Sequence, residues 1–127
     1  MDLSRIHLML AVLAKFTAFP AETLDAYVNI VGGLKAKDPA LDLALCAAFL
    51  SSRNDRPLPA TTLVLGEVGL SGEIRSVPNL QQRLDEAARL GFSEAYVPFH
   101  SREKITAPEG MTLKKLQNVG DLLRALK

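Results

Sequence analysis

The sequence TLVLGEVGLSGEIR occupies residues 62–75 and carries the clearest strand signals in the chain. Its first part, residues 62–65, is a short apolar run of the kind that forms a buried strand. The segment 67–77 that follows contains Gly69 and Gly72, which suits two strands joined by a tight loop. This stretch therefore predicts β-structure in the middle of the chain, and we expect helices on either side of it.

The N-terminal segment has the spacing of an amphipathic helix. Its apolar residues recur three and four positions apart: Ile6, Met9, Leu10, Leu13 and Phe16. Pro20 follows and closes the helix. We therefore expect this face, including Phe16, to lie in the core.

A second helix is expected from Asp38-Pro39 to about Ser52. Aspartate can cap the free N–H groups of the first turn, and proline already has the helical φ angle. Asp42 adds negative charge where the helix dipole favours it. We expect this helix to bury four side chains: Leu41, Leu45, Ala48 and Phe49.

The remaining elements follow from turn residues and apolar runs. Pro78-Asn79 opens a third helix that ends at Gly91 and has four side chains on one face: Leu80, Leu84, Ala87 and Ala88. We also expect strands over residues 24–31, 95–97 and 112–116 and a closing helix over 119–126. This order of elements predicts one mixed α/β (α+β) domain over residues 1–127.

Composition excludes several classes of protein. The chain has 127 residues, a formal net charge of +1 and one cysteine, Cys46. A lone cysteine excludes a disulfide framework within the chain and makes a reducing, cytoplasmic setting the default. Because no segment approaches the roughly 20 apolar residues of a membrane span, we expect no membrane contact. With so little net charge, DNA binding would need a local patch or many copies in an assembly.

Motifs for small-molecule chemistry are absent from the sequence. Neither glycine-rich nucleotide loop occurs, and Gly66, Gly69 and Gly72 fit neither spacing. His7 and His100 lack the partners of a metal site, so we expect no metal and no cofactor in this domain. We expect His7 to be a half-buried helix residue and His100 to be a solvated loop residue.

Four blocks of sequence carry a resemblance to a known family: DAYVNIVGG at 25–33, DPALDLA at 38–44, GEVGLSGEIR at 66–75 and RLDEAARLGF at 83–92. They resemble the C-terminal Lon-protease-like domain of the RadA (Sms) family of bacterial DNA-repair proteins. The likeness covers nearly the whole chain. It implies a Lon proteolytic-domain-like fold, which is the ribosomal protein S5 domain 2-like fold.

The resemblance also implies where a peptidase dyad would lie. Active Lon proteases use a serine nucleophile and a lysine base. The serine position here is Ala40 and the lysine position is Gln81, so the resemblance implies that this domain is no enzyme. A cryptic dyad that pairs Ser71 or Ser76 with Lys35 or Lys37 is the weaker alternative.

The family further implies partners that lie outside this chain. Its members carry a zinc finger and a RecA-like ATPase core with a P-loop, so ATP, magnesium and zinc would belong to missing parts of a longer, DNA-dependent ATPase. The chain would then be its C-terminal fragment. The resemblance implies a scaffold for a hexameric ring that binds single-stranded or branched DNA during recombination and branch migration. A pure oligomerisation module without DNA contact is the alternative.

Five basic residues are candidates for DNA contact: Lys35, Lys37, Arg53, Arg56 and Arg75. The competing interpretation of each is an ordinary solvated charge. Because aromatic residues are only 6% of the chain, we expect contacts to the DNA backbone rather than stacking on bases.

Overall fold

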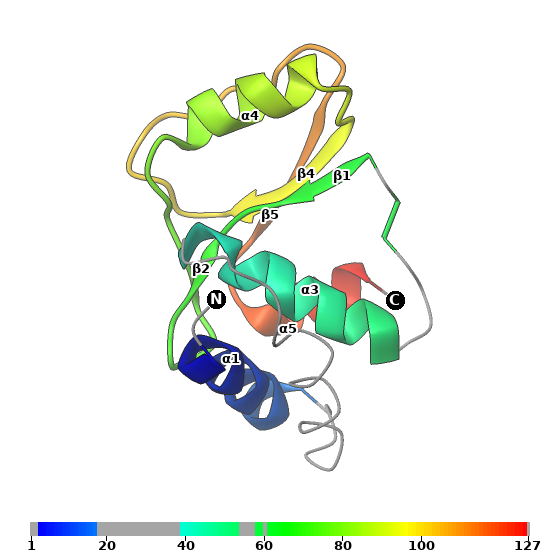
Figure 1. Cartoon of the computed structure of the whole chain (residues 1–127). Helices are drawn as coiled ribbons and strands as arrows, with labels where there is room; N and C mark the ends of the chain where they lie inside the picture. Colours follow the sequence, from blue (N-terminus) through cyan, green and yellow to red (C-terminus); the bar gives the residue numbers. More distant parts are fainter. Residues whose placement is uncertain (1–2, 18–38, 54–57, 60, 127) are drawn as a thin grey trace.

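The computed structural model describes residues 3–17, 39–53, 58–59 and 61–126 (Figure 1). Its elements, in chain order, are α1 (Leu3–Phe16), the 3-10 helix η2 (Pro39–Leu41), α3 (Asp42–Arg53), β1 (Thr62–Val64), β2 (Glu67–Val68), β3 (Ile74–Arg75), α4 (Leu80–Arg89), β4 (Glu94–Pro98), β5 (Thr112–Leu116) and α5 (Val119–Ala125). The mixed α/β class predicted from the sequence is confirmed. The strand predicted over residues 24–31 lies outside the described residues.

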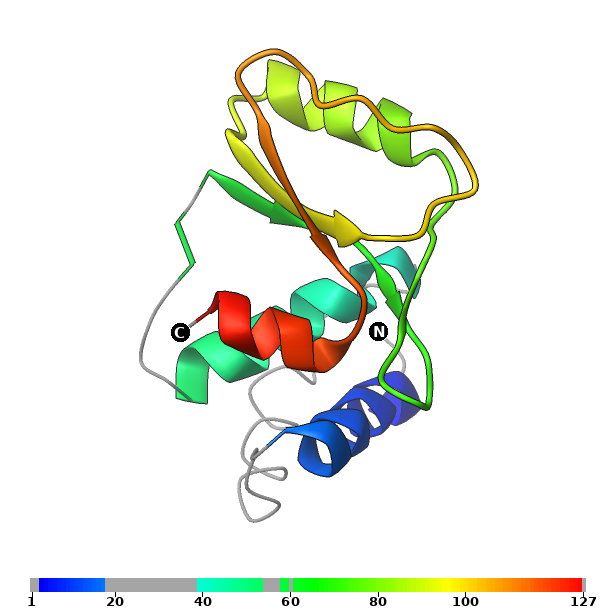
Figure 2. The same ribbon diagram turned by 180° about the vertical axis from the view of Figure 1, so that it is seen from behind.

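A three-stranded parallel sheet with the order β1-β4-β5 separates two layers of helices. Helix α4 covers one face of the sheet, and α3 and α5 lie on the other (Figures 1 and 2). The cross-strand row Leu63, Ala95 and Leu113 packs in the same apolar cluster as α4. The neighbouring positions Val64 and Tyr96 pack in the cluster of α1, α3 and α5. Side chains therefore alternate between the two cores, because successive residues of a strand point to opposite faces.

Two short antiparallel strands, β2 and β3, follow β1 in the chain, and β2 contacts η2 and α3. Gly66 connects β1 to β2, and its amide donates to the carbonyl of Ala40 at 2.8 Å, while its carbonyl accepts from Leu43 at 3.0 Å. A Cβ at Gly66 would lie 3.0 Å from Cγ2 of Ile74. Glycine is favoured here because a Cβ would press on the side chains of Ile74 and Leu43.

Among the helix residues whose burial is described, two that the sequence predicts to be buried are exposed, while Leu41 is half-buried. Ala48 is exposed and not buried as predicted, since α3 packs against α1, α5 and β1 and turns the Ala48 position to solvent. Phe16 is 39% exposed, so the prediction that it lies in the core is also wrong. It occupies the last turn of α1, where its ring covers Gly72.

The connection from β4 to β5 contains no helix. These strands are parallel neighbours, and such pairs need a long crossover that is usually an α-helix. Here residues 99–111 form an irregular loop that runs beside α4 (Figures 1 and 2). In the described part of the chain, no helix is long and apolar enough to cross a bilayer.

Candidate functional site

Ala40 lies in η2, directly before α3, and only 2% of it is exposed. Its methyl group belongs to the apolar cluster of the α4 face, together with Leu65, Val77 and Leu80. Its carbonyl accepts the amide of Gly66. The residue in the serine position is thus a core residue without a hydroxyl, and it supplies no nucleophile.

Gln81 lies in the first turn of α4 and holds the loop 99–111 with its side-chain amide. Nε2 donates a hydrogen bond to the backbone carbonyl of Thr106 at 2.9 Å, and Oε1 accepts one from the backbone N–H of Thr106 at 2.8 Å. Nε2 also donates to Oδ1 of Asp85 at 3.0 Å. Both ends of the amide therefore bind the loop. The lone pair of an amide nitrogen is delocalised into the carbonyl group, so this nitrogen does not act as a base.

A second contact joins the same loop to the N-terminus of α4. The N-cap residue, Asn79, has φ 58° and makes no capping hydrogen bond with its side chain. Instead, Oε1 of Glu103 accepts a hydrogen bond from the backbone N–H of Gln81 at 3.3 Å. A carboxylate is favourable there, since the first turn of a helix has free N–H groups and a positive dipole end.

Of the five basic residues predicted to contact DNA, the structure describes the side chain of Arg75 and not those of the other four. Lys35, Lys37 and Arg56 lie outside the described residues, and of Arg53 only the helical backbone is described. Arg75 is in β3 with a side chain 55% exposed. Its Nε and Nη2 donate to Oε2 of Glu73 at 3.2 and 3.0 Å. DNA contact by these five residues therefore stays a prediction.

Arg75 nevertheless lines a polar hollow of about 580 Å³, which we call the β3 groove. Its lining residues come from β2, β3 and the beginning of the loop after β4: Glu67, Ile74, Arg75, Ser76, His100, Ser101 and Arg102. The amide of Arg102 donates to Oγ of Ser76 at 3.3 Å, which joins the two sides of the groove. His100 is exposed, as the sequence predicts.

The sequence pattern does not single out Arg102, because it lies in an irregular loop with no periodicity. The available signal is loop length, since structureless loops of about 12 residues or more are uncommon and are often functional. The charged run Arg102-Glu103-Lys104 in such a loop is the sequence signal that points to Arg102.

Glu73, which pairs with Arg75 beside the groove, is favoured in its ionised form. A hydrogen bond from its own backbone N–H, followed by that from the Arg75 guanidinium, keeps the pKa of Glu73 below its ordinary value. Oε1 of Glu73 also accepts the amide of Ser71 at 3.1 Å. Glu73 thus fixes the turn between β2 and β3 and orients Arg75.

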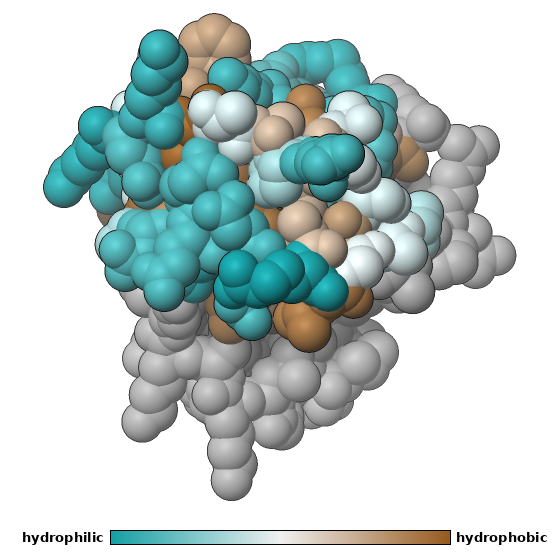
Figure 3. All heavy atoms as spheres, turned by 90° about the horizontal axis from the view of Figure 1, so that it is seen from above, coloured by the Kyte–Doolittle hydropathy of each residue, from teal (hydrophilic) through white to brown (hydrophobic). Residues whose placement is uncertain are grey.

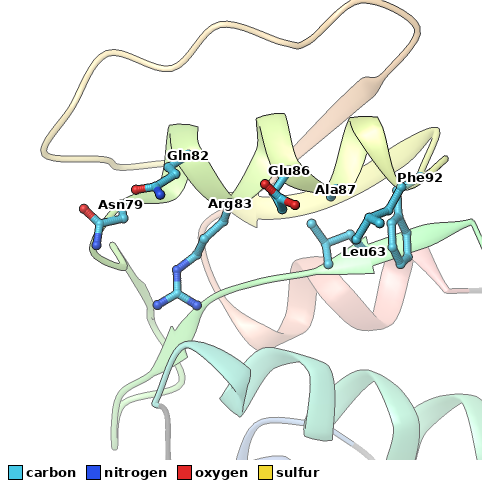
Figure 4. Close-up of a pocket in the computed structure, with 8 residues that line it drawn as sticks. Leu63, Asn79, Gln82, Arg83, Glu86, Ala87 and Phe92 are labelled. Atoms are coloured by element: carbon cyan, nitrogen blue, oxygen red, sulfur yellow. The ribbon is translucent and has the colours of Figure 1, made fainter.

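A second hollow, of about 560 Å³, lies between α4 and β1 and is largely apolar (Figure 4). It is lined by Leu63, Asn79, Gln82, Arg83, Glu86, Ala87, Leu90 and Phe92. Nε of Arg83 donates to the carbonyl of Pro78 at 3.1 Å. Figure 4 shows Leu63 and Phe92 side by side below the helix. Leu90, one of its lining residues, is 72% exposed.

Potential metal ligands are dispersed in the part of the chain that the structure describes. No three His, Cys, Asp or Glu side chains there come close enough to hold a metal ion. Cys46 is fully buried, and burial raises the pKa of its thiol, with the nearby charge of Asp42 as the second cause.

Comparison with known proteins gives one family and a set of relatives. The family described as subunit ChlI of Mg-chelatase matches residues 6–101. Proteins named DNA repair protein RadA are similar over nearly the whole chain: 44% identity over 126 residues in Pseudomonas aeruginosa, 44% over 123 residues in Escherichia coli K12 and 39% over 126 residues in Streptococcus pyogenes serotype M6. These matches cover 97–99% of this chain but only 26–28% of the relatives. The chain thus spans about a quarter of the length of the curated relatives that it matches.

Proposed function

The chain belongs to the protein family described as subunit ChlI of Mg-chelatase, and from this membership and its relatives we propose that it is a non-catalytic scaffold module of a DNA repair and recombination protein. The observation that carries the proposal is the identity of 39–44% to proteins named for DNA repair, over 97–99% of the chain. That similarity covers more of the chain than the family region does, so the proposal follows the DNA repair relatives.

In this proposal the module has the Lon-protease-like fold and supports ring assembly and DNA binding in the cytoplasm. A longer parent protein would supply ATP hydrolysis, magnesium and zinc sites and branch migration. Repetition of one subunit around a ring multiplies each basic contact, and every phosphate that is neutralised releases counterions. The β3 groove supports the DNA-binding part, because it places Arg75 and Arg102 along one hollow.

The residues at the dyad positions support the absence of peptidase activity. Ala40 has no nucleophile, and the amide of Gln81 is hydrogen-bonded to Thr106 and Asp85. A cryptic peptidase would have to pair Ser71 or Ser76 with Lys35 or Lys37, and both lysines lie outside the described residues. We expect no cleavage of casein by the chain. Cleavage that is lost on Ser71→Ala or Ser76→Ala would contradict the proposal.

A pure oligomerisation module is the second candidate, and the apolar hollow between α4 and β1 favours it. Phe92 and Leu63 line this hollow, and Leu90 leaves most of its surface in contact with solvent. Apolar side chains that gather at an accessible hollow favour a protein contact. This candidate differs from the first in one respect, since it predicts no affinity for DNA.

Fluorescence anisotropy separates the two candidates. The chain is titrated into labelled single-stranded and duplex DNA, beside the double variant Lys35→Ala, Lys37→Ala. The proposal expects measurable affinity for DNA that the double variant weakens. Absence of binding at low salt, with oligomers present, would overturn DNA contact and leave the oligomerisation module.

A further inference from the structure

We propose that the outer edge of β5 binds an extended, acidic segment of another protein as an added strand. Within the described residues, β5 is the last strand on its side of the three-stranded sheet. The inference goes beyond the proposed function, because the partner is neither DNA nor a second copy of the chain. Three features of the edge support it: its main-chain groups, its side chains and its charge.

Two residues of β5 have main-chain groups that face away from the sheet. The amide of Thr112 donates to the carbonyl of Ser93 at 3.0 Å, so Thr112 faces β4. Successive residues of a strand turn their N–H and C=O groups to opposite sides, so those of Leu113 and Lys115 face outward. No other described segment is hydrogen-bonded to them on that side. Unpaired groups of this kind are a template for a further strand.

The chain already makes main-chain contacts on this side directly after β5. The carbonyl of Gln117 accepts the amide of Ile74 at 2.9 Å, and Glu73 forms an antiparallel bridge with Asn118. Gln117 has the same alternation as the outward-facing residues of β5. The bridge is isolated, and the strand partner of β3 is β2. An incoming strand can therefore pair with residues 113–115 without displacing these contacts.

The side chains of β5 predict the pattern of the added strand. Thr112, Lys114 and Lys115 are exposed, and Leu113 is half-buried against the apolar cluster of the α4 face. Lys115 lies two residues after Leu113 and so projects from the same face. Side chains of neighbouring strands that lie opposite each other make contact. The partner should therefore carry an apolar residue opposite Leu113 and, two positions away, an acidic residue opposite Lys115.

Charge favours another protein over a second copy of the chain. Lys114 makes its contacts within the chain, since its Nζ is 3.5 Å from Oε2 of Glu94 and 5.5 Å from the centroid of the Tyr96 ring. Among the described residues, Lys115 has no ion-pair partner. Two copies of this edge would bring like charges together, which is unfavourable. A carboxylate opposite Lys115 makes the contact attractive instead.

Selection from a random peptide library supplies the probe. The displayed peptides have about nine residues, which is longer than most strands. They are selected in parallel on the immobilised chain and on its Lys115→Glu variant. We expect the wild type alone to enrich peptides with an apolar and an acidic residue two positions apart. Enrichment of no peptide, or of the same peptides on both chains, would overturn the proposal.

The enriched peptide is then synthesised and titrated against the chain. Lys115→Glu should weaken binding about tenfold, because an attractive cross-strand pair becomes a repulsive one. Lysine in place of the acidic residue of the peptide should restore the affinity for this variant. Lys104→Glu is the matched control, since Lys104 is an exposed lysine in the loop 99–111. Equal weakening by both variants, with unchanged melting temperatures, would show unspecific attraction and contradict the site.

Pairing through the main chain has its own readouts. N-methylation of the peptide amides, one at a time, should abolish binding at every second position, because alternate N–H groups of an added strand face β5. The bound peptide should slow hydrogen exchange of the Leu113 and Lys115 amides. The Thr112 amide, already bonded to Ser93, should change little. A scan without this alternation, or protection elsewhere on the chain, would overturn an added strand.

Other occupants of the edge give different results. If self-association of the free chain, followed by sedimentation velocity, protects the Leu113 and Lys115 amides, a second copy covers the edge. If an oligonucleotide protects these amides and the selected peptides do not, the ligand is a nucleic acid. Either result overturns a protein partner at β5, and neither contradicts the proposed scaffold function.

Discussion

Cys46 lies in the middle of α3 with no exposed surface, and its Sγ is 4.0 Å from Sδ of Met9 in α1. Burial is the main cause of its raised pKa, and the carboxylate of Asp42 one turn earlier adds to it. A thiol that stays protonated is a poor nucleophile, because the thiolate is the reactive form. Cys46 is therefore a packing residue.

Thiol labelling with a chromogenic disulfide reagent checks this assignment. We expect no labelling of the native protein at neutral pH on the timescale of minutes, and labelling of one thiol per chain in denaturant. The denatured sample is the control for reagent and stoichiometry. Rapid labelling of the native protein would show that the packing of α1 against α3 is wrong.

The turn between β2 and β3 is specified residue by residue. Gly72 has φ +79°, and a Cβ there would lie 3.0 Å from the Phe16 ring. Gly69 donates its amide to the carbonyl of Glu73 at 2.9 Å, and a Cβ at Gly69 would lie 2.3 Å from the carboxyl group of Glu73. The φ angle of Gly72 thus requires glycine, whereas a side chain at Gly69 would displace the carboxyl group of Glu73 from the turn.

At the scale of elements, the loop 99–111 depends on Gln81. Its side-chain amide makes two hydrogen bonds to Thr106. The resemblance to the Lon-like domain assigns a lysine of active Lon proteases to this position. The same helix offers a comparison residue, Gln82, whose side chain is exposed. The position that the resemblance assigns to catalysis therefore has a structural contact in this chain.

Hydrogen exchange measures that contact. Gln81→Ala should speed exchange of the Thr106 amide by about fivefold, the change expected from losing about 1 kcal/mol of hydrogen bonding. Gln82→Ala should leave it unchanged. Equal protection of Thr106 in the wild type and the Gln81→Ala variant would contradict the role of Gln81 as the residue that holds the loop.

Two side-chain hydrogen bonds cap the N-terminus of helix α5, and one of them depends on the ionised carboxylate of Asp121. Oδ1 of Asn118 accepts the amide of Asp121 at 2.9 Å, and Oδ2 of Asp121 accepts the amide of Gln117 at 2.8 Å. The hydrogen bond from Gln117 is the largest cause that keeps the pKa of Asp121 below its ordinary value of 3.8, and a hydrogen bond from Arg124 adds to it. The folded state therefore favours the ionised carboxylate more than the unfolded state does.

The sign of the pH dependence follows from that difference. As the pH falls, Asp121 is protonated in the unfolded chain before it is protonated in the folded chain, because its pKa is lower in the folded state. The stabilisation is therefore complete above about pH 5 and is lost as the pH falls through the folded-state pKa. The measurement is the free energy of unfolding in urea between pH 7 and pH 3. Asp121→Asn should show a shallower decrease over the acid range than the wild type, and the exposed Glu109→Gln should not. Parallel curves for the wild type and Asp121→Asn would contradict the cap.

The helices and strands were predictable because each has local signals. Residues 80–89 show helical spacing between turn residues, and Thr112 and Leu116 bound a strand that the sequence predicts at the same residues. The parallel pairing of β4 with β5 was not predictable, since strand order depends on contacts between distant segments. The β3 groove is another such case, because Arg75 and Arg102 meet only after the loop has folded over α4.

Over the whole molecule, charge constrains how the module could work. A net charge of +1 gives a single copy little long-range attraction for DNA. Viewed over α4 and the neighbouring loop, the surface is largely hydrophilic with scattered apolar residues (Figure 3). Affinity should then come from local contacts such as Arg75 and Arg102, multiplied by assembly.

The most direct test of the scaffold proposal combines sedimentation velocity with anisotropy on the same samples of the chain, at about 50 mM and about 200 mM salt. The account predicts that DNA binding rises with the fraction of oligomer and weakens at the higher salt concentration, because each copy adds phosphate contacts. Affinity that is independent of salt, or equally tight for the monomer and the oligomer, would contradict it.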